Sequence, residues 1–155
     1  MVPSAHSSIV QPVPSPVAVN GLGPVLLVDD DDAVRNVTRG MLERLGCRVF
    51  VARDGFEALE RYDAEREHIR LVLLDLSMPG MDGVEVLREL RLHDPELRVV
   101  LMSGYAGLGF DERLQPGELA GFLQKPYSLA ALCQALVAAF EERSPGHRGT
   151  GLPST

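Results

Sequence analysis

The chain has 155 residues, 45% of them hydrophobic and 24% charged, which fits one globular domain with short extensions. Its formal net charge of −7 argues against nucleic acid as a direct partner, because phosphate backbones attract clustered Lys and Arg. No apolar run approaches the roughly 18 residues of a membrane span, and the N-terminus has no signal-peptide pattern. A cytoplasmic location without membrane contact is therefore expected.

The two ends differ in composition from the middle of the chain. Residues 1–23 carry repeated prolines among Ser, Ala and Val, with neither a helical nor a strand period. Such a segment buries too little apolar surface to offset its ordering entropy, which predicts a disordered leader or linker. Residues 144–155, rich in Ser, Pro, Gly and Thr, are predicted to be a disordered tail. The folded domain is expected at residues 24–143.

Between these ends, short apolar runs alternate with stretches of helical period. The runs of strand length are Val25–Val28, Cys47–Ala52, Leu71–Leu74, Arg98–Met102 and Gly121–Gln124. Apolar residues spaced by three or four predict four helices with an apolar inward face. The first apolar residues of these faces are Val34 and Val37, Phe56, Val84 and Leu129. Gly46 is expected to end the first helix and Ser128 to cap the last. A further helix over Ala106–Leu114 has the least regular pattern, since it contains two glycines.

This alternation predicts an α/β fold. Strands separated by helices form right-handed βαβ units, and their strands lie parallel in one sheet that is covered on both faces. Five strands and five helices in about 120 residues indicate a doubly wound five-stranded parallel sheet of order 2-1-3-4-5, the flavodoxin-like arrangement. In such sheets a site forms beyond the carboxyl ends of the strands. The two cysteines, Cys47 and Cys133, lie in apolar surroundings and are expected to be buried thiols.

Polar residues follow the strands at that edge. Asp29 and Asp30 follow the first strand, Asp75 the third, Ser103 the fourth and Lys125 the fifth. Three converging carboxylates repel one another unless a cation lies between them, and oxygen ligands suit Mg²⁺, with Mn²⁺ as an alternative. A carboxylate beside such an ion can attack phosphorus and form an acyl phosphate. Each residue alone is also explained by a helix cap or a turn, but the joint pattern favours a phosphoryl-transfer site.

Four segments together resemble the response-regulator receiver domain. They read VLLVDDDD, LVLLDLSMPGMDG, VVLMSGY and FLQKP, and the resemblance covers residues 24–143. It implies that Asp75 is the phosphoacceptor and that Asp30 binds Mg²⁺ directly. Asp29 would assist in holding the ion, and the backbone carbonyl of Ser77 would complete the protein ligands.

The resemblance also implies a switch. Ser103 stands at the family's switch hydroxyl, Lys125 at the residue that pairs with the phosphoryl group, and Phe122 at the aromatic switch position, where Tyr is common. The Lys125–Pro126 peptide bond is expected to be cis. Tyr105 stands where the family tunes hydrolysis of the acyl phosphate. Phosphorylation would shift the surface formed by the fourth helix (Ala106–Leu114), the fifth strand and the last helix.

The partners implied are a histidine kinase or histidine phosphotransfer protein as donor and an unidentified downstream protein as target. Homodimerisation on phosphorylation is left open. The chain would not be an enzyme, because it accepts the phosphoryl group itself. The sequence leaves open whether it acts as a single-domain regulator or is a receiver fragment of a hybrid histidine kinase; a further alternative is an interaction module that works without phosphorylation.

Two rival functions share features of this pattern. A flavodoxin-like mononucleotide binder would have a loop rich in Ser, Thr and Gly after the first strand, whereas this loop holds four aspartates. A phosphatase with an aspartyl nucleophile commonly carries a second Asp two residues after the first, where this chain has Ser77.

Overall fold

The computed structural model describes residues 23–104, 112–115 and 117–141. In chain order the elements are β1 (Val25–Val28), α2 (Asp32–Arg44), β2 (Val49–Ala52), α3 (Gly55–Glu65), β3 (Leu71–Asp75), α4 (Gly83–His93), β4 (Arg98–Ser103), β5 (Gly121–Gln124) and α5 (Leu129–Glu141). Tyr105 and most of the helix expected at Ala106–Leu114 lie outside the described residues, and Glu112–Gln115 are not helical. None of the described helices is long and apolar enough to cross a membrane.

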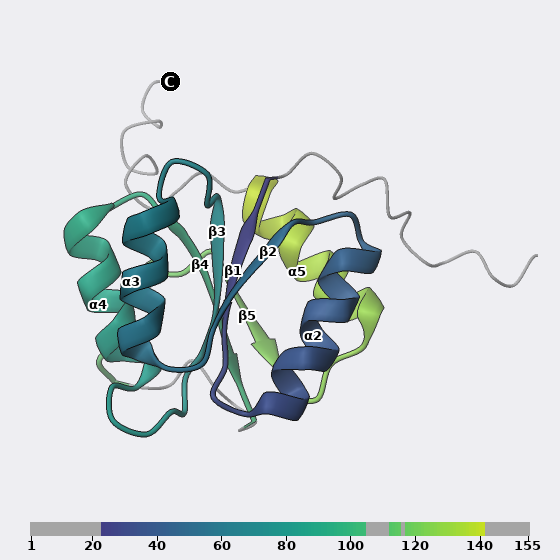
Figure 1. The fold of residues 1–155 in the computed structure, drawn as a ribbon, viewed down its shortest axis with the longest axis horizontal. Coiled ribbons are helices and arrows are strands. Elements are labelled where there is room, and N and C mark those ends of the chain that lie inside the picture. Colours follow the sequence, from purple (N-terminus) through teal and green to yellow (C-terminus); the bar gives the residue numbers. More distant parts are fainter. Residues whose placement is uncertain (1–22, 105–111, 116, 142–155) are drawn as a thin grey trace, which may run out of the picture.

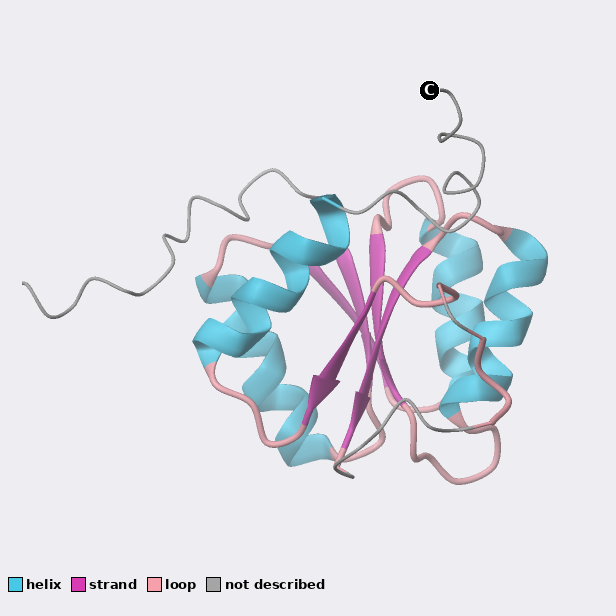
Figure 2. Cartoon of the chain, turned by 180° about the vertical axis from the view of Figure 1, so that it is seen from behind, coloured by secondary structure: helices cyan, strands magenta, loops and turns pink. Residues whose placement is uncertain are grey.

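The strands form one parallel sheet in the order β2-β1-β3-β4-β5, which confirms the predicted topology. Helices α2 and α5 cover one face of this sheet, and α3 and α4 cover the other (Figure 1). The same two layers are seen from behind in Figure 2. Because all five strands run in one direction, their carboxyl ends share a single edge, which is where ligand sites form in folds of this kind.

The core consists of two apolar clusters, one on each face of the sheet. Along β1 and β3, Leu27 and Leu73 belong to the cluster under α2 and α5, whereas Leu26 and Leu74 belong to the cluster under α3 and α4. This alternation follows from the period of two in a strand, whose successive side chains point to opposite faces. All residues of β1 and β3 are buried, which explains why both runs are continuously apolar.

Helix α2 ends where the sequence predicts, but Val37, expected on its inward face, is exposed. Asp31 is its N-cap and accepts a hydrogen bond from the Val34 amide, and Gly46 follows its end at φ +93°, a left-handed conformation that suits glycine. Its buried residues are Thr38 and Leu42, whereas Val37 is 59% exposed. The assignment of Val37 to the core face was therefore wrong.

Phe56 was also wrongly expected to face inward. Its side chain is 63% exposed, and α3 buries Gly55, Ala58 and Tyr62. Leu59 is partly buried against the cluster under α3 and α4, so the error is confined to Phe56 in the first turn of the helix. Ser128 does cap α5, since its Oγ accepts from the Ala131 amide at 3.0 Å.

Three strand boundaries differ from the apolar runs. Strand β2 begins at Val49 rather than Cys47, because the Cys47 amide donates to the Leu42 carbonyl at the end of α2. Strands β3 and β4 extend one residue further and include Asp75 and Ser103. These two polar residues are thus held by the sheet itself. Both cysteines are buried and free, as predicted.

Candidate functional site

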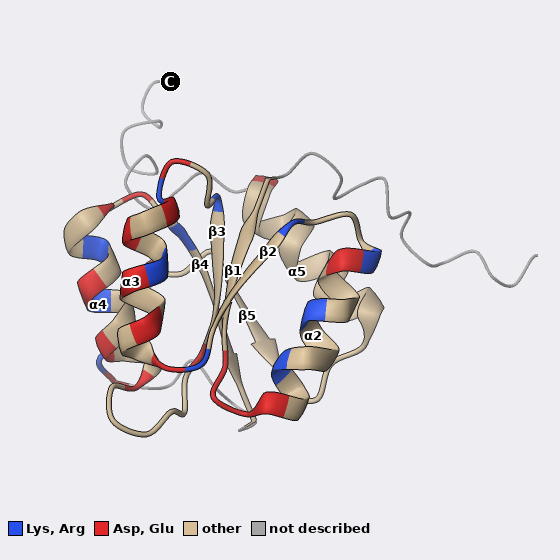
Figure 3. Cartoon of the chain, viewed as in Figure 1, with Lys and Arg blue, Asp and Glu red and all other residues tan. Residues whose placement is uncertain are grey.

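The carboxyl edge of the sheet brings together the predicted carboxylates. Figure 3 shows acidic residues gathered between the end of β1 and the start of α2. Oxygen atoms of Asp29, Asp30 and Asp75 lie within 4.8 Å of one another. Asp29 and Asp75 are 0% and 4% exposed, whereas Asp30 is open to solvent. The residues come from β1 and β3, which are neighbours in the sheet although far apart in the sequence.

Lys125 reaches into this cluster from the end of β5. Its Nζ donates to Asp29 Oδ2 at 2.9 Å and lies 3.4 Å from Asp75 Oδ1. Burial opposes the charged ammonium, but the bond to Asp29 and the charge of Asp75 outweigh it, so the pKa of Lys125 is raised. The lysine is therefore held in its charged form beside two buried carboxylates.

Asp75 titrates far from the ordinary range of an aspartate. Burial, followed by the charge of Asp29, raises the pKa of Asp75 to about 7. Lys125 and the Ser77 amide, which donates to Asp75 Oδ1 at 3.3 Å, act in the opposite direction. One lysine thus compensates only part of the negative charge of the cluster, and a bound cation would compensate the rest.

The loop that carries Asp29 and Asp30 is braced from α2. The Asp31 amide donates to Asp29 Oδ1 at 2.9 Å, and Arg35 Nη1 donates to the Asp29 carbonyl at 2.9 Å. Arg35 also pairs with Asp32 at 2.6 Å. Sequence reasoning missed Arg35, although its spacing of three from Asp32 on a helix was a usable signal.

The loop after Asp75 packs so tightly that a glycine is needed. The Gly83 amide donates to the Leu76 carbonyl at 2.9 Å. A Cβ at Gly83 would come within 2.6 Å of the Asp75 carbonyl oxygen, which is shorter than any real contact of a Cβ with another atom. Gly83 therefore lets the start of α4 lie directly against the backbone of Asp75.

The donor set fits a hard divalent cation. Carboxylate oxygens are the ligands that Mg²⁺ prefers, and an exposed residue beside buried ones leaves room for water ligands. Asp29, Asp30 and Asp75 would supply the side-chain oxygens. The role of the Ser77 backbone carbonyl as a metal ligand stays a prediction.

Ser103 and Phe122 lie where the sequence predicts, but their roles as a switch stay predictions. Ser103 is buried at the end of β4, and its carbonyl accepts from the Lys125 amide at 2.7 Å. Phe122 is partly buried in β5, opposite Leu101, and packs against the cluster under α3 and α4. The Lys125–Pro126 bond is cis, as expected.

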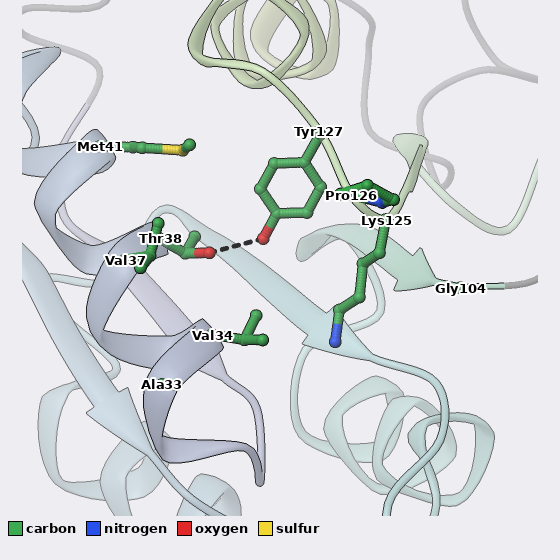
Figure 4. Close-up of a pocket in the computed structure, with 9 residues that line it drawn as sticks. All are labelled: Ala33, Val34, Val37, Thr38, Met41, Gly104, Lys125, Pro126 and Tyr127. Carbon is green, nitrogen blue, oxygen red and sulfur yellow. Dashed lines mark hydrogen bonds between the residues drawn. The ribbon is translucent and has the colours of Figure 1, made fainter.

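A mostly apolar groove of about 520 Å³ adjoins the site. Lys125 and Gly104 lie at its end nearest the carboxylates, and α2 and Tyr127 form its walls (Figure 4). Tyr127 was not singled out from the sequence. Its hydroxyl lies 2.7 Å from Thr38 Oγ1, a contact between residues 89 positions apart that no local pattern reveals.

The fold and site define a receiver, and comparison with known proteins agrees. Residues 25–137 match the family model of the response regulator receiver domain, so the chain belongs to that family, whose members act in two-component signalling. It is 38% identical over 125 residues to the sensor kinase CckA of Brucella abortus, covering 81% of this chain and 13% of the relative. It is 34% identical to sporulation initiation phosphotransferase F of Bacillus subtilis, covering 72% and 89% respectively.

The chain thus spans about an eighth of the kinase and most of the small phosphotransferase. Among solved structures, a CheY-like receiver domain protein from Methanospirillum hungatei has a TM-score of 0.69 at 26% identity, covering 84% of this chain and all of that one. The regulator TrrA from Thermotoga maritima, solved in complex with Mg²⁺ and beryllium fluoride, has a TM-score of 0.67 at 25% identity, covering 76% and 98%.

Proposed function

We propose that the chain accepts a phosphoryl group on Asp75 from a histidine kinase or a histidine phosphotransfer protein, in a reaction that needs Mg²⁺. The observation that carries this proposal is the cluster of Asp29, Asp30 and Asp75 within 4.8 Å, with Lys125 Nζ 3.4 Å from Asp75. The solved complex of the Thermotoga maritima relative with Mg²⁺ and beryllium fluoride supports it.

The transfer step follows from these groups. A carboxylate oxygen of Asp75 attacks the phosphorus of a phosphohistidine, the P–N bond breaks as the O–P bond forms, and the electron pair stays on the imidazole nitrogen. Lys125 moves its ammonium from the carboxylates toward a phosphoryl oxygen. Mg²⁺, when bound, neutralises charge on the phosphoryl oxygens. Asp29, Asp30 and Asp75 would hold that ion through side-chain oxygens, and Ser77 would contribute its backbone carbonyl.

The output of this reaction is a change of surface. Ser103, at the end of the strand next to Asp75, donates a hydrogen bond from its hydroxyl to a phosphoryl oxygen. Phe122 moves inward together with Ser103. The surface of β5 and α5 shifts as a result, and an unidentified downstream protein or a second copy of the chain binds it. Phe122 is only partly buried in this structure, and an inward movement would increase its burial.

The phosphoryl donor docks in the groove between α2 and Tyr127. Val37 exposes 59% of its surface there, and the groove leads to Lys125 at its inner end. An amphipathic helix that carries the phosphohistidine fits such a groove, since its apolar face would cover Val34, Val37 and Met41. A Val37→Lys variant is expected to keep its reaction with acetyl phosphate but to accept phosphoryl groups from a histidine kinase about tenfold more slowly.

The same proposal makes the chain a signalling protein and not an enzyme, since the phosphoryl group ends on the chain itself. It also implies a cytoplasmic location, where ATP-dependent kinases act. Direct binding of nucleic acid is not part of the proposal, because the net charge is −7.

The test uses acetyl phosphate and the intact mass of the protein. We expect a gain of one phosphoryl group in the presence of Mg²⁺, no gain in EDTA, and no gain in the Asp75→Asn variant. Asp63→Asn is the matched control, because Asp63 is an exposed aspartate on α3 and should leave the reaction unchanged. Modification of Asp75→Asn at the parental rate would refute the proposal.

A further inference from the structure

We propose that Tyr127 is a positioning residue for Lys125, acting through a hydrogen bond of its hydroxyl with Thr38. The inference rests on the proposed function, because it concerns the lysine that pairs with the transferred phosphoryl group. Tyr127 touches neither the carboxylates nor the phosphoryl group, so its part is to hold the chain segment that does.

The hydroxyl of Tyr127 joins three separate parts of the fold. It lies 2.7 Å from Thr38 Oγ1 on α2 (Figure 4). It also donates to Met102 Sδ on β4 at 3.2 Å. A hydroxyl has one proton, so both contacts are satisfied when Thr38 donates to Tyr127 and Tyr127 donates to the sulfur. Met102 directly precedes Ser103 in β4. The segment from β5 to α5 is thereby tied to α2 and to the strand that ends in Ser103.

Thr38 makes this tie specific. It is 2% exposed, and within the described part of the chain its hydroxyl has Tyr127 as its hydrogen-bond partner. A buried hydroxyl without a partner is unfavourable, so this pair selects one position of the Tyr127 ring. An apolar pair at the same two sites would pack, but it would allow the ring to slide.

Lys125 depends on such a tie because its side chain is long. Its Nζ reaches Asp29 at 2.9 Å across several rotatable bonds, and it does so from a backbone held by two anchors. The first anchor is the bond from the Lys125 amide to the Ser103 carbonyl at 2.7 Å. The second is Tyr127, two residues later. Loss of the second anchor displaces the ammonium relative to Asp75. The rate of a transfer reaction depends strongly on the positions of the reacting groups, so this displacement should slow the reaction.

The experiment measures the rate of Asp75 phosphorylation by acetyl phosphate at saturating Mg²⁺ in the full chain. The variants are Tyr127→Phe, Thr38→Val and the two combined. We expect each variant to react about tenfold more slowly, with the half-saturating Mg²⁺ concentration unchanged, because the carboxylates are intact. The combined variant should be no slower than either single one, because both remove the same hydrogen bond.

The combined variant separates positioning from stability. Tyr127→Phe leaves the Thr38 hydroxyl unpaired and should lower the melting temperature, whereas the combined variant leaves no unpaired hydroxyl and should recover it. A positioning role predicts that the rate stays low after stability recovers. A rate that recovers together with the melting temperature would show a structural role and overturn the inference.

Tyr62→Phe is the matched control. Its hydroxyl is also buried and donates to Asp94 at 3.0 Å, but it lies on α3, away from Lys125. We expect this variant to lose stability and keep the parental rate. Equal rates for Tyr127→Phe and the parent would overturn the inference alone, whereas a parent that takes up no phosphoryl group would overturn the proposed function and the inference with it.

Discussion

Asp75 combines two properties at the residue scale: it ends a buried strand, and it faces a second buried carboxylate. Burial keeps water away from the Asp75 carboxylate, the negative charge of Asp29 disfavours its ionisation, and Lys125 lies beside it as a compensating cation. Burial and the charge of Asp29 therefore raise the pKa of Asp75 to about 7. With this pKa the carboxylate is only partly ionised near neutral pH, and a bound cation would lower the pKa and increase the fraction that is ionised and able to attack phosphorus.

This pKa predicts how stability depends on pH in EDTA. The folded chain keeps a proton on Asp75 up to pH about 7, whereas the unfolded chain loses it near pH 4. The folded state binds more protons in this window, so the free energy of unfolding falls as pH rises from 4 to 7. Asp75→Asn removes this loss, and its stability relative to the parent should be about 1–3 kcal/mol more favourable at pH 8 than at pH 5.

Urea denaturation of both chains at the two pH values measures this difference. Asp63→Asn, at an exposed position, serves as the control and should show almost no such change. If Asp75→Asn and the parent lose stability in parallel between pH 5 and pH 8, the raised pKa of Asp75 is wrong.

At the element scale, α2 shows how a helix can be predicted correctly and still be given the wrong face. Val34, Val37 and Met41 have helical spacing, but the buried residues of the helix are Thr38 and Leu42, and Met41 is only partly buried against the core. Val34, Val37 and Met41 also line the groove beside Lys125. A sequence pattern measures hydrophobicity alone, and it therefore cannot distinguish apolar residues that pack on the sheet from apolar residues that stay exposed.

The burial of Leu42 and the exposure of Val37 predict a large loss of stability for one truncation in this helix and almost none for the other. Leu42→Ala opens a cavity in the cluster under α2 and α5 and should lower the free energy of unfolding by about 2–5 kcal/mol. Val37→Ala removes an exposed side chain and should change it by less than about 0.5 kcal/mol. Urea denaturation of both variants measures these changes. A large loss of stability in Val37→Ala would show that Val37 packs in the core.

At the scale of the whole molecule, an ion held between β1 and β3 would bind the folded chain and not the unfolded one. Mg²⁺ should therefore raise stability, by about 2.7 kcal/mol at a hundred times its dissociation constant. Asp30→Asn should abolish most of this gain, measured as the shift in melting temperature between EDTA and Mg²⁺.

Asp31→Asn gives a control with the same change of charge one residue away. Asp31 is the N-cap of α2, and asparagine caps a helix as well as aspartate does, so the fold should be unaffected. We expect this variant to keep the full Mg²⁺-dependent shift. Equal shifts in Asp30→Asn and Asp31→Asn would mean that the ion binds elsewhere.

The domain bounds of 24–143 stay a prediction at this scale. Both apolar clusters are made of residues between Val25 and Phe140, which agrees with them. The sheet order and the meeting of Asp29, Asp30, Asp75 and Lys125 at one edge were predictable, because strand and helix periods are local properties and parallel strands share their carboxyl ends.

The sequence by itself indicated which polar residues lie at the carboxyl ends of the strands, since Asp29 and Asp75 follow continuous apolar runs and Lys125 follows the short run Gly121–Gln124. The tertiary structure alone decided which residues of α2 are buried, the bracing of the Asp29 loop by Arg35, and the contact between Thr38 and Tyr127. The physical reason is the distance along the sequence over which each kind of interaction acts. Periodicity acts over a few neighbouring residues, whereas a hydrogen bond across 89 positions exists only after the sheet has brought α2 and α5 to the same face.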